Sequence, residues 1–323
     1  MSAEILPLTS GVYLSAHLAP FAAWLARDEV TEILVNQPGE VWIEAAGTPG
    51  MTRIEDPAID NRLLERLAQQ IARETHQGIN RERPVLAATL PDGARVQIIA
   101  PPATRKHWAL AIRRHRLIDV PLSAYDHGAI LPGVADDWRG QNWQADPIAF
   151  LKRAVAARAT ILVSGGTSSG KTTFLNALLR EVPPAERVIL VEDTPEIRLT
   201  HANAVGLIAV KGEMGEAKLS TNDLLQASLR MRPDRIVLGE LRGNETVSFL
   251  RAINTGHPGS FSTIHANSPS GALEQLALMV MQSGLGLSRA ETIAYAKGVI
   301  DVIVQLDRVA GERRIVDIMI TTE

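Results

Sequence analysis

The chain has 323 residues, enough for two domains, and its content of 46% apolar and 21% charged residues is ordinary for a soluble globular protein. A net charge of −3 and only 4% aromatic residues argue against direct nucleic-acid binding, whether through a basic surface or through an extended base-stacking surface. The absence of cysteine excludes disulfides, cysteine-ligated zinc and thiol catalysis.

The first 117 residues predict an α+β domain. We expect no signal peptide, and no stretch of the chain approaches the ~20 apolar residues of a spanning helix, so any membrane contact is expected to be peripheral or through a partner. The apolar pattern favours helices at 18–25 and from residue 60 onward, and strands at 31–36, 41–43, 85–90, 96–99 and 107–112. Nothing in this domain is an enzymatic signature of its own.

Basic side chains gather around the last strands of this domain, at Arg95, Arg105, Lys106, Arg113, Arg114 and Arg116. One interpretation is a solvated basic face. The other is that some of these arginines complete a phosphate site from outside the domain that holds the phosphate loop. The residue pattern leaves both interpretations open.

Residues 118–145 predict a linker, because prolines and glycines interrupt a polar, weakly periodic stretch. The second domain, residues 146–323, begins at Asp146-Pro147, a cap followed by a proline at the first helical position. From there helices alternate with strands at 160–164, 188–191, 236–239 and 259–264, before two closing strands at 299–306 and 314–320. This alternation predicts an α/β fold with a mostly parallel sheet.

A phosphate-binding loop follows the first strand of the second domain. Its residues are Gly165, Gly166, Thr167, Ser168, Ser169, Gly170, Lys171, Thr172 and Thr173, and they satisfy G-x-x-x-x-G-K-[ST] between a strand and a helix. In that setting backbone N–H groups and a helix N-terminus face the phosphates of a nucleotide. Lys171 is expected to reach the β- and γ-phosphates of ATP, and the Thr172 hydroxyl to bind Mg²⁺.

Three further candidates stand where strands of the predicted sheet end: Glu192, Glu240 and His265. Ligands of parallel α/β sheets bind beyond the carboxyl ends of the strands, so these residues are expected near the loop. The two glutamates are candidates for holding the metal and orienting water. Gly239 stands where a metal-binding aspartate is usual before Glu240.

Four long motifs together resemble the secretion and traffic ATPases that serve type IV secretion, type II secretion and type IV pili. They are the phosphate loop at 165–173, the "Asp box" VILVEDTPE at 188–196, an atypical Walker B segment at 229–242 and the "His box" at 256–267. Shorter matches at 32–36, 90–96 and 112–114 extend the resemblance over nearly the whole chain. The resemblance implies a C-terminal RecA-like P-loop domain preceded by the smaller α+β domain. The type II secretion branch usually carries a tetracysteine zinc module, so a chain without cysteine most resembles the conjugal-transfer ATPases of the TrbB kind.

The resemblance also implies roles for individual residues. Glu192 matches the family's catalytic glutamate, which orients or deprotonates water, and Glu240 is expected to hold Mg²⁺ through water, although the two could exchange roles. His265 is expected on the γ-phosphate side. Arg113 is our first choice for a γ-phosphate contact from the N-terminal domain, followed by Arg95 and Arg114. Arg230 and Arg242 could instead be salt-bridge partners within the core.

By resemblance, the protein is expected to be a cytoplasmic homohexamer, peripheral on the inner membrane, where it contacts membrane components of a type IV secretion apparatus. ATP would lie between the two domains, near a subunit boundary, and its hydrolysis would power conjugative pilus assembly or substrate transfer. The alternatives are a RecA-like nucleic-acid motor, a motor of type IV pili or type II secretion, a small-molecule kinase and a ring subunit that does not hydrolyse ATP. A nucleic-acid motor would show a basic, aromatic-bearing channel and stimulation by DNA.

Overall fold

The computed structural model describes residues 12–114, 138–140, 142–211, 217–310 and 312–321. The chain divides into two compact units, the first comprising residues 1–117 and 205–232, the second residues 118–204 and 233–323. Most of the predicted linker, like Arg116, lies outside the described residues. Within the described ranges, no helix combines the length and the apolar character needed to cross a membrane.

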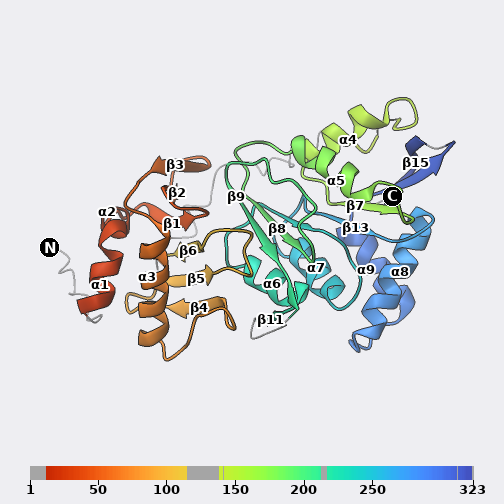
Figure 1. The fold of residues 1–323 in the computed structure, drawn as a ribbon. Coiled ribbons are helices and arrows are strands. Elements are labelled where there is room, and N and C mark those ends of the chain that lie inside the picture. Colours follow the sequence, from red (N-terminus) through yellow and green to blue (C-terminus); the bar gives the residue numbers. More distant parts are fainter. Residues whose placement is uncertain (1–11, 115–137, 141, 212–216, 311, 322–323) are drawn as a thin grey trace, which may run out of the picture. The chain divides into compact units, whose positions relative to one another are not determined.

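The first unit is built on a six-stranded antiparallel sheet with the order β3-β2-β1-β6-β5-β4 (Figure 1). The strands are β1 (Val30–Val35), β2 (Glu40–Ala45), β3 (Met51–Glu55), β4 (Val85–Thr89), β5 (Arg95–Ile99) and β6 (Ala109–Arg113). The helical elements are α1 (Val12–Leu18), a 3₁₀ turn (Ala19–Phe21), α2 (Ala22–Leu25) and α3 (Asn61–Glu74). They supply the apolar side chains that bury one face of the sheet.

Helix α3 shows how the sequence builds this core. Asp60 caps the helix by accepting a 2.6 Å hydrogen bond from the backbone N–H of Leu63. Leu64, Leu67 and Ile71 then recur at helical spacing and are buried. They pack in one cluster with Ile33, Val96 and Ile112, which alternate along the strands with residues of the opposite face.

A short stretch between the two halves of the second unit completes the first unit. It holds β10 (Val210–Lys211), β11 (Lys218–Leu219) and α6 (Thr221–Ser228). The division between the units falls inside β9 (Ala204–Ile208). Helix α6 begins with a capping box, in which Ser220 and Asp223 satisfy each other's backbone N–H groups.

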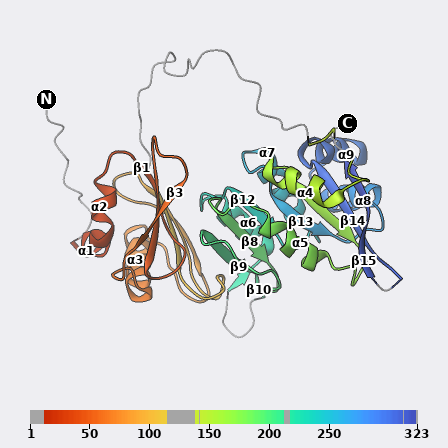
Figure 2. The same cartoon turned by 90° about the horizontal axis from the view of Figure 1, so that it is seen from above.

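The second unit contains a parallel sheet that ends in one antiparallel hairpin, and its strand order is β15-β14-β7-β13-β12-β8 (Figures 1 and 2). Its strands are β7 (Ile161–Gly165), β8 (Val188–Glu192), β12 (Arg235–Leu238), β13 (Phe261–Ile264), β14 (Val302–Val309) and β15 (Glu312–Ile320). Five of them run parallel, and β15 pairs antiparallel with β14 at the edge. The predicted α/β fold is confirmed.

Helices α4 (Pro147–Ala156) and α5 (Lys171–Arg180) contribute to one core cluster with this sheet. The remaining helices are α7 (Glu245–Asn254), α8 (Pro269–Gln282) and α9 (Arg289–Val299). The prediction of a strand from residue 299 was wrong at its start. Helix α9 opens with a capping box at Ser288 and Glu291, continues through Val299, and leaves β14 to begin at Val302.

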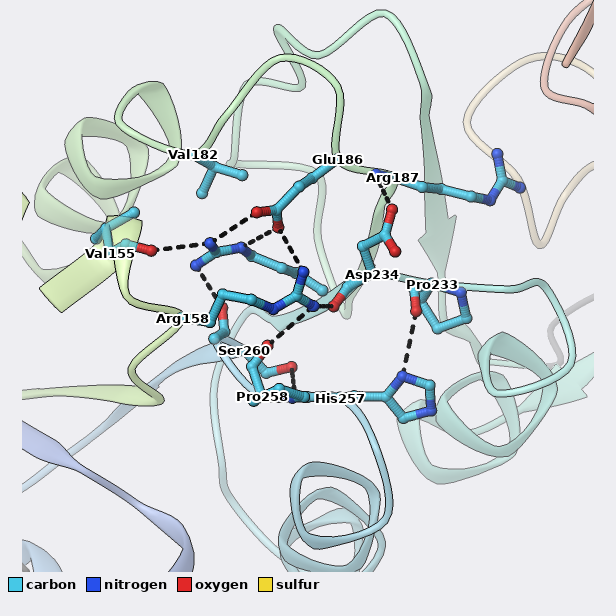
Figure 3. A network of polar contacts seen from close by, with 12 residues as sticks. Val155, Arg158, Val182, Glu186, Arg187, Pro233, Asp234, His257, Pro258 and Ser260 are labelled. Atoms are coloured by element: carbon cyan, nitrogen blue, oxygen red, sulfur yellow. Dashed lines mark hydrogen bonds and ion pairs between the residues drawn. The ribbon is translucent and has the colours of Figure 1, made fainter. Parts of the chain in front are cut away.

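A buried polar network closes the end of the sheet where β8 and β12 begin (Figure 3). Arg235 is fully buried, and its guanidinium donates to both carboxylate oxygens of Glu186 and to the carbonyls of Val155 and Gly259. Asp234 accepts a 2.8 Å bond from the backbone N–H of Arg187. The Pro-Asp-Arg part of the atypical Walker B segment therefore anchors the strand at the end opposite the phosphate loop.

We expect Arg235→Met to destabilise the second unit by roughly 3–5 kcal/mol, because it leaves the largely buried Glu186 carboxylate without its main partner. The control is Arg251→Met, at an exposed position on α7, which should change stability by only about 0.5 kcal/mol. Urea unfolding of the two variants is the measurement. Equal urea midpoints for the two variants would contradict a structural role for the network.

Candidate functional site

The phosphate loop connects the end of β7 to the start of α5 and takes a conformation that its small residues permit. Gly170 has φ +92°, and Ser168 also lies in the left-handed region at φ +64°. The Ser169 hydroxyl donates to the Gly166 carbonyl at 2.9 Å. A Cβ on Gly165 would lie 2.3 Å from the Ser169 hydroxyl oxygen, so only glycine fits there. No side chain caps α5, so the first N–H groups of the helix remain available to an anion.

Arg313 is a neighbour of this loop that the sequence interpretation missed. Its side chain comes from β15 and lies across Gly170, where an added Cβ would be 2.6 Å from Arg313 Cδ and 3.0 Å from its Nε. The turn of the β14–β15 hairpin brings Arg313 back along the strand next to β7. The only sequence signal was a pair of arginines after a predicted turn, which does not identify a distant contact.

We expect Gly170→Ala to weaken nucleotide binding at least tenfold, because alanine is strained at φ +92° and its methyl group collides with Arg313. Titration with a fluorescent ADP analogue would measure the loss. Gly166 is the matched control: it lies in the same loop, has no heavy atom within 4 Å of an added Cβ and does not have a positive φ, so Gly166→Ala should bind more tightly than Gly170→Ala. The reverse order would contradict this reading of the loop.

Lys171, the loop lysine, is buried and folds back onto the loop. Its Nζ donates to the carbonyls of Gly165 at 2.9 Å and Gly166 at 3.1 Å, and it lies 3.3 Å from His265 Nδ1. Burial lowers the pKa of the Lys171 ammonium below its ordinary value; Glu240 opposes this change and Arg242 adds to it. Phosphate oxygens at this position would favour the charged ammonium and reverse the effect.

Two of the three predicted strand-end residues form a chain with this lysine. His265 Nε2 lies 2.8 Å from Glu240 Oε1, while its other ring nitrogen faces Lys171. A neutral imidazole that donates from Nε2 to Glu240 has a lone pair on Nδ1 for the ammonium, so the carboxylate selects the tautomer that suits Lys171. Glu240 also pairs with Arg242, which lies 3.8 Å from Asp193. The structure therefore brings Lys171, His265 and Glu240 together.

Glu192, the third strand-end residue, is buried and holds its own loop. Its Oε1 accepts the backbone N–H groups of Glu196 at 3.0 Å and Ile197 at 2.8 Å. It stands beside Gly239, the residue that follows the neighbouring strand β12, where an added Cβ would lie 3.3 Å from Glu192 Cγ. Thr172, at the start of α5, donates its hydroxyl proton to Glu196 Oε2 at 3.3 Å. The sequence interpretation gave Glu196 no role.

The predicted arginines of the N-terminal domain lie in the first unit and fall into two groups. Strand register places Arg113 beside Glu32 on one side and Arg95 on the other, on the face of the sheet opposite the helices. Arg113 pairs with Glu32 at 3.3 Å. Arg113 and Arg95 line a cavity of about 710 Å³, together with Arg230 and Arg232. Arg114 instead donates to the backbone carbonyls of Arg27 and Val30, so it is not brought together with the other two.

Comparisons with known proteins agree over most of the chain. The family model described as "Type II/IV secretion system protein" matches residues 140–313. "Type IV secretion system protein PtlH homolog" of Bordetella bronchiseptica is 42% identical, covering 94% of this chain and 93% of that protein. "Type IV secretion system protein VirB11" of Bartonella henselae is 34% identical, covering 93% of this chain and 91% of that protein.

A solved structure is similar over the same extent. It is the crystal structure of the VirB11 ATPase from the Brucella suis type IV secretion system in complex with sulphate. The match covers 95% of this chain and 94% of that chain, with 34% sequence identity and a TM-score of 0.87.

Proposed function

Because the chain belongs to the Type II/IV secretion system protein family, we propose that it is a homohexameric motor that powers pilus assembly or substrate transfer through a type IV secretion system. The chain is an ATP-hydrolysing enzyme of type IV secretion, and the similar solved structure is named a VirB11 ATPase of a type IV secretion system. The observation that carries this function is the phosphate loop at the end of β7, with Lys171 linked through His265 to Glu240.

Each residue of the proposed catalytic site has a task in hydrolysis. Lys171 leaves the loop carbonyls and binds the β- and γ-phosphates, while the N–H groups at the start of α5 bind phosphate oxygens. Glu192 orients or deprotonates the attacking water, and His265 lies on the γ-phosphate side. The hydrogen bonds from the backbone to Glu192 fix its carboxylate before substrate arrives, which reduces the reorganisation that the reaction needs.

Mg²⁺ fits the oxygen donors of this site. Within the described ranges no group of three or more histidine, cysteine or acidic side chains forms a ready-made metal cage. Mg²⁺ does not require one, since it usually binds through one or two carboxylates together with substrate phosphates and water. The Thr172 hydroxyl and the Glu240 carboxylate would hold it, and Mg²⁺ would neutralise charge on the phosphate oxygens.

The two parts of the chain are assigned different tasks. We assign the second unit to the RecA-like class. For the chain as a whole we propose a domain of residues 1–117 and a domain of residues 146–323, joined by a linker at 118–145. Arg113 and Arg95 contribute positive charge to the γ-phosphate from the first domain. The cavity that they line, in which arginines outnumber the single carboxylate of Glu32, supports an anionic ligand. Arg114 is assigned to the same site on resemblance alone, and its contacts to the backbone support a structural role instead.

We expect Arg113→Ala to weaken binding of a non-hydrolysable ATP analogue about tenfold and to leave ADP affinity nearly unchanged, because ADP has no γ-phosphate for the arginine to bind. Isothermal titration with both nucleotides measures the difference. Arg73→Ala, at an exposed position on α3, is the control, because this helix packs on the other face of the sheet. An equal loss of affinity for both nucleotides, or no loss for either, would contradict a γ-phosphate contact and leave Arg113 as a surface ion-pair partner of Glu32.

We place the protein in the cytoplasm, peripheral on the inner membrane, in contact with membrane components of the secretion apparatus. A nucleic-acid motor is the main rival. Native mass measurement with and without a Mg²⁺–ATP analogue, combined with phosphate release with and without DNA, tests the proposal. A hexamer whose ATP hydrolysis is indifferent to DNA is expected. A monomer in all conditions, or hydrolysis that requires DNA, would overturn it.

A further inference from the structure

One place in the proposed metal site lacks its usual carboxylate. Phosphate-loop ATPases commonly hold Mg²⁺ between the loop Ser or Thr and an aspartate of the Walker B strand. Here the residue after β12 is Gly239, and a Cβ at this position would press on Glu192 Cγ at 3.3 Å. An aspartate at 239 would therefore compete for space with the buried Glu192.

A carboxylate from another strand reaches the threonine instead. Glu196 follows β8, and its Oε2 accepts a hydrogen bond of 3.3 Å from the Thr172 hydroxyl. Thr172 is the residue that the proposed function assigns to Mg²⁺. A hydroxyl whose proton is held by a carboxylate keeps its lone pairs for a cation, which is the arrangement that the usual aspartate provides.

The position of Glu196 is fixed from two sides. Glu192 accepts the backbone N–H groups of Glu196 and Ile197, which ties the loop to the end of β8. Asn176 on α5 accepts the backbone N–H of Arg198 at 2.7 Å and donates to the Thr172 carbonyl at 3.0 Å. The loop that carries Glu196 is thus attached both to the strand of Glu192 and to the helix of Thr172.

We propose that Glu196 takes the place of the missing Walker B aspartate, orienting the Thr172 hydroxyl for Mg²⁺. Glu192 and Asn176 are positioning residues for this contact. The inference rests on the proposed function, because it requires that the loop binds a nucleotide with Mg²⁺. It goes further by giving a role to Glu196 and a reason for Gly239: the glycine leaves room for the glutamate that holds the substitute carboxylate in place.

The test uses the full chain and measures how much Mg²⁺ tightens the binding of a fluorescent ADP analogue. Glu196→Ala, Thr172→Val and the double variant are compared with wild type. Glu181→Ala, at an exposed position at the end of the same helix α5, is the matched control. Circular dichroism verifies that each variant is folded, and because Glu196 is exposed its replacement should not affect folding. We expect Glu196→Ala to reduce the Mg²⁺ enhancement about tenfold and the double variant to resemble Thr172→Val.

Each outcome decides a separate question. Wild-type protein that binds the analogue without any Mg²⁺ enhancement would contradict the metal assignment of the proposed function. If Mg²⁺ tightens binding normally in wild type, and Glu196→Ala shows the same enhancement as Glu181→Ala, the role of Glu196 alone would be overturned. Losses from Glu196→Ala and Thr172→Val that multiply in the double variant would also overturn it, because the two side chains would then act independently.

Discussion

Lys171→Ala is expected to lower ATP turnover by at least roughly a hundredfold and to weaken binding of both ADP and an ATP analogue. The ammonium is buried against the loop carbonyls and, in the proposed site, binds the β- and γ-phosphates. In the proposed site the ammonium binds the phosphates in the ground state and binds them more strongly as charge develops in the transition state, so its loss should raise KM and lower kcat. Phosphate release and nucleotide titration on the purified variant are the measurements.

Lys152 on α4 is the control for this substitution. Lys152 is exposed, and its ammonium pairs with Glu181 at 3.4 Å rather than with a residue of the proposed site. Lys152→Ala should therefore hydrolyse ATP at the wild-type rate. Turnover close to wild type in Lys171→Ala would remove the loop from the mechanism. Loss of folding in Lys171→Ala, detected by circular dichroism, would show that the lysine is needed to hold the loop carbonyls before any nucleotide binds.

Glu192→Gln is expected to slow hydrolysis by about 10²–10⁴ while nucleotide binding is retained. Glutamine keeps the oxygen that accepts the N–H groups of Glu196 and Ile197, so the loop should stay in place while the negative charge is lost. Single-turnover phosphate release, together with titration of an ATP analogue, separates chemistry from binding.

Glu240→Gln provides the comparison for the roles of the two glutamates. Its side chain pairs with His265 and Arg242. If Glu240 holds the metal, its variant should lose much of the Mg²⁺ dependence of binding. Normal hydrolysis by Glu192→Gln, with an inactive Glu240→Gln that still binds Mg²⁺ and ATP, would show that the roles are reversed.

Those features of the site that depend on local sequence were predictable. The phosphate loop needs glycine at defined positions between a strand and a helix, and this order can be seen in the sequence. Glu192, Glu240 and His265 were placed near it because parallel strands bring their carboxyl ends to one edge of the sheet. The capping boxes at Ser220 and Ser288 were also predictable, since both partners lie three residues apart.

Other features were not predictable because they depend on contacts between distant residues. Strand β3 was missed, since none of its residues is fully buried and its burial pattern does not alternate regularly. Arg313 reaches Gly170 only because the β14–β15 hairpin folds back beside β7. The contact between Thr172 and Glu196 requires the loop geometry that Glu192 imposes, which no short motif specifies. Residues 205–232 were assigned to the second domain, and their grouping with the first unit follows from packing between distant segments.

The most direct test of the central claim is phosphate release from ATP by the wild-type protein, measured with Mg²⁺ and again after chelation by EDTA. We expect steady release of phosphate with Mg²⁺ and almost none after chelation, because in the proposed site the oxygens of Thr172 and Glu240 would hold a metal that neutralises charge on the phosphates. Absence of ATP-dependent phosphate release, or release that EDTA leaves unchanged, would contradict it.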